Sequence, residues 1–70
     1  MIGMVYRGDV YDALDICWLT TRQVAERVER TCRRQSAHEA QVWQCLDRLA
    51  GDGMAERQRI GSTVVWRRIR

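Results

Sequence analysis

The sequence predicts an α+β domain, a bundle of three helices followed by a C-terminal β-hairpin. Two helix starts are marked by capping motifs, at Thr20 and Ser36, each with a Gln or Glu three residues later. Two short segments around Gly61-Ser62 then resemble paired strands. The chain of 70 residues is long enough for one small core, so we expect a single domain over residues 1–70.

The first helix is expected over residues 10–17. Asp9 stands at the position of an N-cap, where a side-chain oxygen can bind the free backbone N–H groups of the first turn. The residues of its buried stripe follow at helical spacing: Val10, Ala13, Leu14 and Cys17. Trp18 and Leu19 then form a short extended link, which we expect to pair with the hairpin.

The second helix is expected over residues 21–31. The Thr20 side chain can accept a hydrogen bond from the backbone N–H of Gln23, whose own side chain reaches back to the Thr20 backbone. Leu19 before this capping box and Val24 after it are placed as a hydrophobic staple.

The third helix is expected over residues 37–50. Ser36 is its predicted N-cap, and Glu39 completes a second capping box. Its core face carries a stripe of five residues: His38, Val42, Cys45, Leu46 and Leu49. Gly51 is expected to adopt the left-handed conformation that ends a helix.

The hairpin is expected to pair residues 54–60 with residues 63–69 through a type II′ turn at Gly61-Ser62. In this register one face carries Met54, Ile60, Val65 and Ile69, and we expect this face to close the core. The opposite face carries Arg57, Arg59, Val64, Trp66, Arg68 and Arg70.

Positive charge gathers in the second part of the chain. All 12 basic residues are Arg; residues 1–26 carry a net charge of −2, and residues 27–70 carry +5. Arg makes forked hydrogen bonds to phosphate and guanine, so this asymmetry favours a nucleic-acid partner. The lack of Lys has an alternative explanation, which is codon bias in a GC-rich genome.

Three segments of the sequence resemble parts of a known fold: Leu19–Ala25, Leu46–Arg57 and Val65–Arg68. They are similar to the start of the second helix, the end of the recognition helix and the returning wing strand of the winged helix-turn-helix superfamily. This resemblance covers residues 9–69. It implies that the helix over 37–50 enters the major groove and that the hairpin over 54–69 is a basic wing.

The resemblance and the residue types together define candidate contacts to double-stranded DNA. On the third helix they are Ala37, Ala40, Gln41, Gln44 and Arg48, because Gln can pair with adenine, Arg with guanine, and Ala can contact a thymine methyl. At the end of the second helix they are Arg33 and Arg34. On the wing they are Arg57, Arg59, Trp66 and Arg68, with Arg57 expected to stack on Trp66.

Each of these sets has a second interpretation that involves no ligand. The helix residues can form an ordinary solvated face, and Trp66 can fold over the edge of the core among solubilising arginines. Arg33 and Arg34 can stabilise a helix C-terminus through its dipole.

The function that follows is a small transcriptional regulator that binds DNA. The alternative is a protein–protein interaction module, such as a small viral or plasmid protein acting on a host factor. Trp18, Trp43 and the mildly acidic third helix favour this alternative. A homodimer is compatible with both, because residues 1–8 can form a dimerisation arm or a frayed end.

Catalysis, a cofactor and a metal are not expected. The chain has one His and no glycine-rich phosphate loop. Cys32, His38 and Cys45 do not have the spacing of a zinc site. The odd number of cysteines and the absence of a leader or a membrane span indicate a cytoplasmic protein, associated with the nucleoid if it binds DNA.

Overall fold

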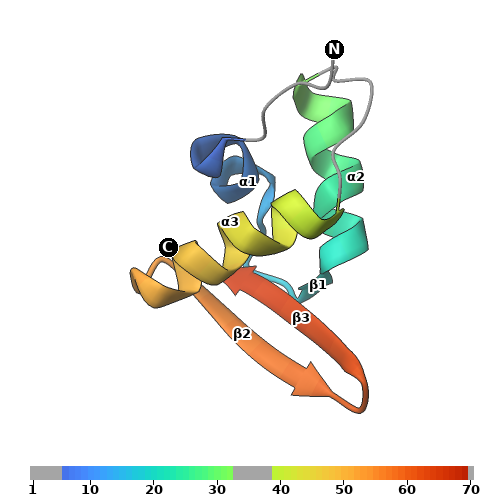
Figure 1. The fold of residues 1–70 in the computed structure, drawn as a ribbon, viewed down its shortest axis with the longest axis vertical. Coiled ribbons are helices and arrows are strands. Elements are labelled where there is room, and N and C mark those ends of the chain that lie inside the picture. Colours follow the sequence, from blue (N-terminus) through green and yellow to red (C-terminus); the bar gives the residue numbers. More distant parts are fainter. Residues whose placement is uncertain (1–5, 33–38, 70) are drawn as a thin grey trace.

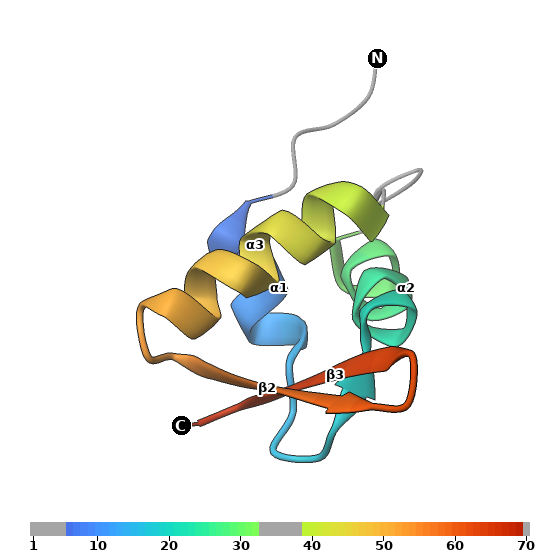
Figure 2. The same cartoon turned by 60° about the horizontal axis from the view of Figure 1, so that its bottom comes forward.

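The computed structural model describes residues 6–32 and 39–69, apart from the side chain of Cys32. Three helices lie on one side of a three-stranded antiparallel sheet with the strand order β1-β3-β2 (Figure 1 and Figure 2). The elements are α1 (Arg7–Ala13), β1 (Leu19–Thr20), α2 (Thr21–Cys32), α3 (Glu39–Gly51), β2 (Ala55–Ile60) and β3 (Thr63–Arg68). None of the helices described here is long and apolar enough to cross a membrane.

The first helix lies earlier in the chain than predicted. It begins after Tyr6, so the interval 10–17 is wrong, and Asp9 lies within the first turn rather than at the N-cap. An acid in that turn still stabilises the helix through its dipole. The helix ends because the backbone of Leu14 is extended, with φ −70° and ψ 154°. Cys17 is therefore exposed and does not extend the buried stripe.

The start of the second helix is confirmed. The backbone N–H of Gln23 donates to Thr20 Oγ1 at 3.1 Å, and the Thr20 N–H donates to Gln23 Oε1 at 2.9 Å. The extended link before it is also confirmed, one residue later than expected. It is strand β1, in which Leu19 lies opposite Trp66 of β3.

The third helix ends on a different glycine from the one predicted. Gly51 is still helical, whereas Gly53 has a φ of +78°. The Met54 N–H donates to the Leu49 carbonyl at 2.9 Å, and the Gly53 N–H donates to the Ala50 carbonyl at 3.2 Å. This pair of bonds requires a left-handed residue two positions beyond the last helical one, a place that glycine fills without strain.

The hairpin register is confirmed, but the prediction of which face closes the core is wrong. Arg57 lies opposite Trp66, as predicted, and Gly61 in the turn has a φ of +62°. Residues opposite each other in a ladder share a face. The inner face, toward the helices, carries Ala55, Arg57, Arg59, Val64, Trp66 and Arg68. The outer face carries Met54, Glu56, Gln58, Ile60, Thr63, Val65, Arg67 and Ile69.

Burial separates these two faces clearly. Trp66 is 0% exposed and Ala55 is 4% exposed, and both belong to the main core cluster. Met54, Ile60 and Ile69 of the outer face are 41%, 57% and 42% exposed. Val65 is buried on the outer face, apart from the main core cluster.

The indole of Trp66 accounts for this orientation. Its Nε1–H donates to Thr21 Oγ1 at 2.9 Å, so the one polar group of the ring is satisfied inside the protein. Its ring meets the ring of Trp43 edge to face, with centroids 5.8 Å apart. Trp66 is the largest apolar side chain of the hairpin, and its burial with a satisfied donor favours the inward orientation of the inner face.

The remaining core is formed by the predicted stripes of α2 and α3 together with Val10, Ala13, Leu14 and Leu19. The buried residues of these helices are Val24, Ala25, Val28, Val42, Leu46 and Leu49. Cys45 is half-buried against this cluster. Several predictions lie outside the described residues: residues 1–5 of the arm expected over 1–8, the Ser36 cap, and the positions of Arg33, Arg34, Ala37, His38 and Arg70. The arm is wrong for Arg7 and Gly8, which belong to α1.

Candidate nucleic-acid interface

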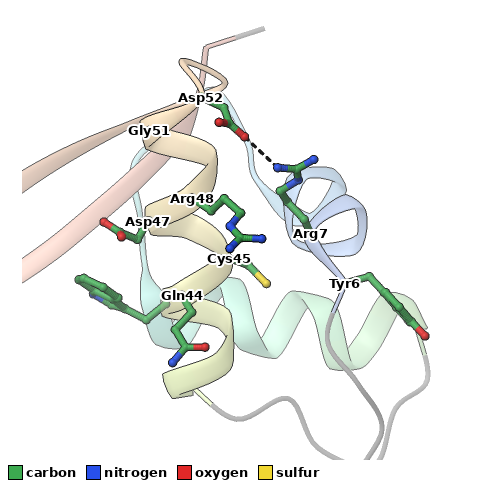
Figure 3. A pocket seen from close by; sticks show the side chains of 9 residues that line it. Tyr6, Arg7, Gln44, Cys45, Asp47, Arg48, Gly51 and Asp52 are labelled. Atoms are coloured by element: carbon green, nitrogen blue, oxygen red, sulfur yellow. Dashed lines mark hydrogen bonds and ion pairs between the residues drawn. The ribbon is translucent and has the colours of Figure 1, made fainter.

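A row of exposed side chains runs along the outward side of α3. Ala40, Gln44 and Arg48 are spaced four residues apart, which places them on one helix face, and all three are exposed. We call these three residues the α3 ridge. The side chains of Gln44 and Arg48 both extend from α3, and they point away from the strands of the hairpin (Figure 3). The prediction that these residues are accessible is therefore confirmed.

The structure gives Gln41 a different position from the other predicted helix contacts. Gln41 is only half-exposed, and its Oε1 atom is buried without a hydrogen-bond partner among the described residues. A side chain held in this way presents less of its amide to a ligand than Gln44 does. We therefore leave Gln41 out of the α3 ridge.

The hairpin supplies the second part of the surface. Arg57 and Arg59 lie on the inner face of β2, and both are exposed. The tip of the hairpin projects beyond the helices (Figure 1). Arg57 Nη1 lies 3.0 Å from Oδ1 of Asp47 on α3. This ion pair joins the hairpin to the helix and places Arg57 beside the α3 ridge.

One of the predicted wing contacts, Trp66, is wrong, and another, Arg68, lies against a neighbouring ring. Trp66 is completely buried and offers no surface to a ligand. The expected stack of Arg57 on Trp66 is present, with the guanidinium carbon 5.8 Å from the ring centroid, but it covers the core rather than exposing an aromatic platform. Arg68 is half-buried, and its guanidinium lies 5.4 Å from the ring centroid of Tyr11 in α1.

Ion pairs neutralise much of the positive charge on the described surface. Residues 6–32 and 39–69 hold nine Arg and nine acidic residues, so the net charge of +3 resides on Arg33, Arg34 and Arg70. Among the arginines of residues 6–32 and 39–69, four form ion pairs with described acids: Arg7 with Asp52, Arg27 with Asp15, Arg57 with Asp47, and Arg67 with Glu56. The other five described arginines form no ion pair with any described residue: Arg22 and Arg30 on α2, Arg48 on α3, and Arg59 and Arg68 on the hairpin.

An open groove lies beside the α3 ridge, between α3 and the start of α1 (Figure 3). Tyr6 and Arg7 line it from the α1 side, and Arg7 Nη1 lies 2.8 Å from Asp52 Oδ2 after α3. Burial raises the pKa of the Cys45 thiol in this groove, although Arg48 and Arg7 oppose the shift. The thiol is therefore protonated and weakly nucleophilic near neutral pH.

Sequence reasoning missed the contacts that fix this surface. The Asp47–Arg57 pair joins residues ten positions apart across a helix, a turn and a strand. The Arg7–Asp52 and Trp66–Thr21 bonds each join residues 45 positions apart. No local spacing rule links such residues, and only the hairpin register pointed toward part of this network.

Comparisons with known proteins agree with this geometry at the level of fold. No protein-family model matches the sequence, and no curated protein matches it. A similar solved structure comes from work on the DNA recognition and protein interaction domains of HOP2 and its homologous DNA pairing properties. It has a TM-score of 0.74 and 17% identity, over 89% of this chain and 95% of that chain. The three helices, the hairpin and this likeness show that the chain is an α+β domain with the winged helix-turn-helix fold.

Proposed function

We propose that this chain binds double-stranded DNA and acts as a small transcriptional regulator in the cytoplasm. In this proposal the α3 ridge enters the major groove, and the tip of the hairpin lies along the phosphate backbone. The observation that carries the proposal is the exposure of two arginines, Arg48 on α3 and Arg59 on the hairpin, that form no ion pair with any described residue. The similar HOP2 structure, whose description includes DNA recognition, supports it.

The chemistry of the α3 ridge suits base recognition. The fork of Arg48 matches the O6 and N7 acceptors of guanine, and the amide of Gln44 matches the N6 donor and N7 acceptor of adenine. Ala40 is small enough for a thymine methyl to approach the helix. Each good two-bond contact is worth about 1–3 kcal/mol of discrimination against the wrong base.

The hairpin supplies fewer phosphate contacts than its four arginines suggest. Arg57 and Arg67 are held by acids, and Arg68 lies over Tyr11, so Arg59 is the principal free cation there. One phosphate contact changes the slope of log affinity against log salt by about −0.9. Arg33 and Arg34, if they also contact phosphate, would bring the slope to about −2.7.

A titration of labelled duplexes at several salt concentrations tests the proposal. We expect Arg59→Ala to weaken binding to every sequence and to reduce the slope by about 0.9. We expect Arg48→Ala to cost about 1–3 kcal/mol on a preferred duplex selected from a random library. Gln44→Ala should broaden the base preference at one position with a smaller loss of affinity.

Arg67→Ala is the matched control, because it removes the same charge from the outer face of the hairpin. Circular dichroism should first show that each variant is folded. Affinity should then be unchanged in the control. Absence of duplex binding by the wild-type chain at low salt would contradict the proposal, and so would equal losses for Arg67→Ala and Arg59→Ala.

A protein-interaction module is the second candidate function. Three aliphatic residues of the outer face, Met54, Ile60 and Ile69, are more than 40% exposed. Exposed apolar groups of this kind occur at partner sites. A pull-down from nuclease-treated lysate should retain one protein partner under this alternative, and that partner should be lost in an Ile60→Asp variant.

A further inference from the structure

An acidic residue lies within the surface proposed to face DNA. Asp47 follows Gln44 by one turn on α3, and about half of its side chain is exposed. Its carboxylate accepts a hydrogen bond from Arg57 Nη1 of the hairpin at 3.0 Å. A carboxylate repels phosphate, so its presence here opposes generic attraction to DNA.

We propose that Asp47 is a specificity-determining residue that lowers affinity for generic duplex DNA. This inference rests on the proposed function. Asp47 acts in two ways: its charge repels the phosphate backbone, and it holds Arg57 in an ion pair that phosphate must displace. A protein gains specificity by weakening its wrong complexes as well as by strengthening the right one.

The position of Arg57 makes this role physically reasonable. Its guanidinium is fixed from two sides, by the Asp47 carboxylate and by the ring of Trp66 at 5.8 Å. Without the carboxylate, the Trp66 ring and the rigid strand still hold the cation at the same edge of the protein. The freed guanidinium would then be available to phosphate without any rearrangement of the backbone.

Stability alone does not explain the Asp47–Arg57 pair. The side chains of the two residues are 53% and 47% exposed, and ion pairs at such exposure contribute little to folding. The outer face of the hairpin carries an equivalent pair, Glu56 with Arg67, whose side chains are 43% and 39% exposed. These two pairs have the same chemistry but lie on opposite faces, which provides a matched experiment.

The experiment compares Asp47→Asn with Glu56→Gln, because each variant removes one negative charge and releases one arginine. Affinity is measured by fluorescence anisotropy on a mixed-sequence duplex and on a preferred duplex, over a range of salt. Asp47→Asn should bind the mixed-sequence duplex roughly threefold or more tightly at low salt, with a slope steeper by about 0.9. Glu56→Gln should remain within roughly twofold of wild type on both duplexes.

A double variant separates the two effects of Asp47. Adding Arg57→Ala to Asp47→Asn should remove the extra slope, because the released cation is then gone. Equal gains in Asp47→Asn and Glu56→Gln would overturn the inference in favour of net charge. A loss confined to the preferred duplex would also overturn it, since Asp47 would then be a base contact, as a carboxylate accepting from cytosine is.

The outcomes also distinguish this inference from the proposed function. If Arg48→Ala weakens binding while Asp47→Asn leaves affinity and slope unchanged, DNA binding stands and the role of Asp47 is wrong. If neither the wild-type chain nor Asp47→Asn binds any duplex at low salt, both are wrong.

Discussion

The two faces of the hairpin have similar apolar content but differ in how much of it is buried. The inner face buries Ala55 and Trp66 under the helices, whereas the outer face leaves Ile60 and Ile69 in solvent. Both faces alternate regularly along the strands, so alternation alone does not determine which face turns inward. The two faces differ in that the inner one carries Trp66, whose size and hydrogen bond to Thr21 favour its burial.

Removing Trp66 should therefore have the largest effect on stability. Trp66→Ala deletes the largest fully buried side chain and leaves Thr21 Oγ1 without its donor. We expect a loss of about 3–5 kcal/mol in the free energy of unfolding, measured by urea denaturation. Ile60→Ala on the outer face should change this free energy by no more than about 0.5 kcal/mol.

A loss of 3–5 kcal/mol approaches the whole stability of a small domain, so a milder variant is also needed. Trp66→Phe keeps an aromatic ring but removes the N–H donor, and it should cost at least about 1 kcal/mol. If Ile60→Ala proved as damaging as Trp66→Phe, the assignment of inner and outer faces would be wrong.

Much of the fold could be predicted because its signals are local. The Thr20–Gln23 capping box lies within four residues, and the apolar stripe of α3 follows helical spacing. The hairpin register followed from the two-residue turn at Gly61-Ser62. The facing of the hairpin was predicted wrongly because it depends on Thr21, a residue 45 positions from Trp66.

The candidate site shows the same limit. The exposure of Gln44 and Arg48 follows from their position opposite the apolar stripe of α3, and it was predicted. The burial of Trp66 and the pairing of Arg57 with Asp47 were not, because both depend on how the hairpin packs against the helices. Charge counting along the chain could not show which arginines are neutralised in space.

The turn between α3 and β2 should show an intermediate effect. This turn fixes the direction in which the chain continues from α3 into β2, and Gly53 within it has a φ of +78°. Gly53→Ala should destabilise the protein by about 1 kcal/mol, because an L-residue is strained in the left-handed region. Gly51→Ala should stabilise it by up to about 1 kcal/mol, because Gly51 is helical.

This glycine pair is well controlled, because nothing lies within 4 Å of a Cβ built at either position. Steric clash therefore does not contribute to the effect of either substitution. Thermal or urea denaturation of the two variants can compare their free energies of unfolding directly. Destabilisation by Gly51→Ala, with no effect of Gly53→Ala, would instead indicate that Gly51 is the left-handed residue that ends α3, as expected from the sequence.

The smallest effect concerns the loop that leads into β1. The backbone N–H of Ile16 and the guanidinium of Arg27 hold the pKa of Asp15 below its ordinary value of 3.8. A carboxyl whose pKa is lower in the folded state than in the unfolded state stabilises the protein at pH values above the unfolded pKa. This stabilisation is lost as the pH falls through the folded pKa. Asp15→Asn should slightly lower the urea midpoint at pH 7, and this difference should shrink as the pH falls below 3.8 and vanish below the lowered folded pKa.

The most direct test of the account is a backbone chemical-shift map recorded while duplex DNA is added to the folded chain. We expect the largest changes at the α3 ridge and at Arg59, on the side of the hairpin that carries Trp66. Residues of the outer face, such as Arg67 and Ile69, should change little. Changes concentrated on the outer face, with the α3 ridge unaffected, would contradict the account.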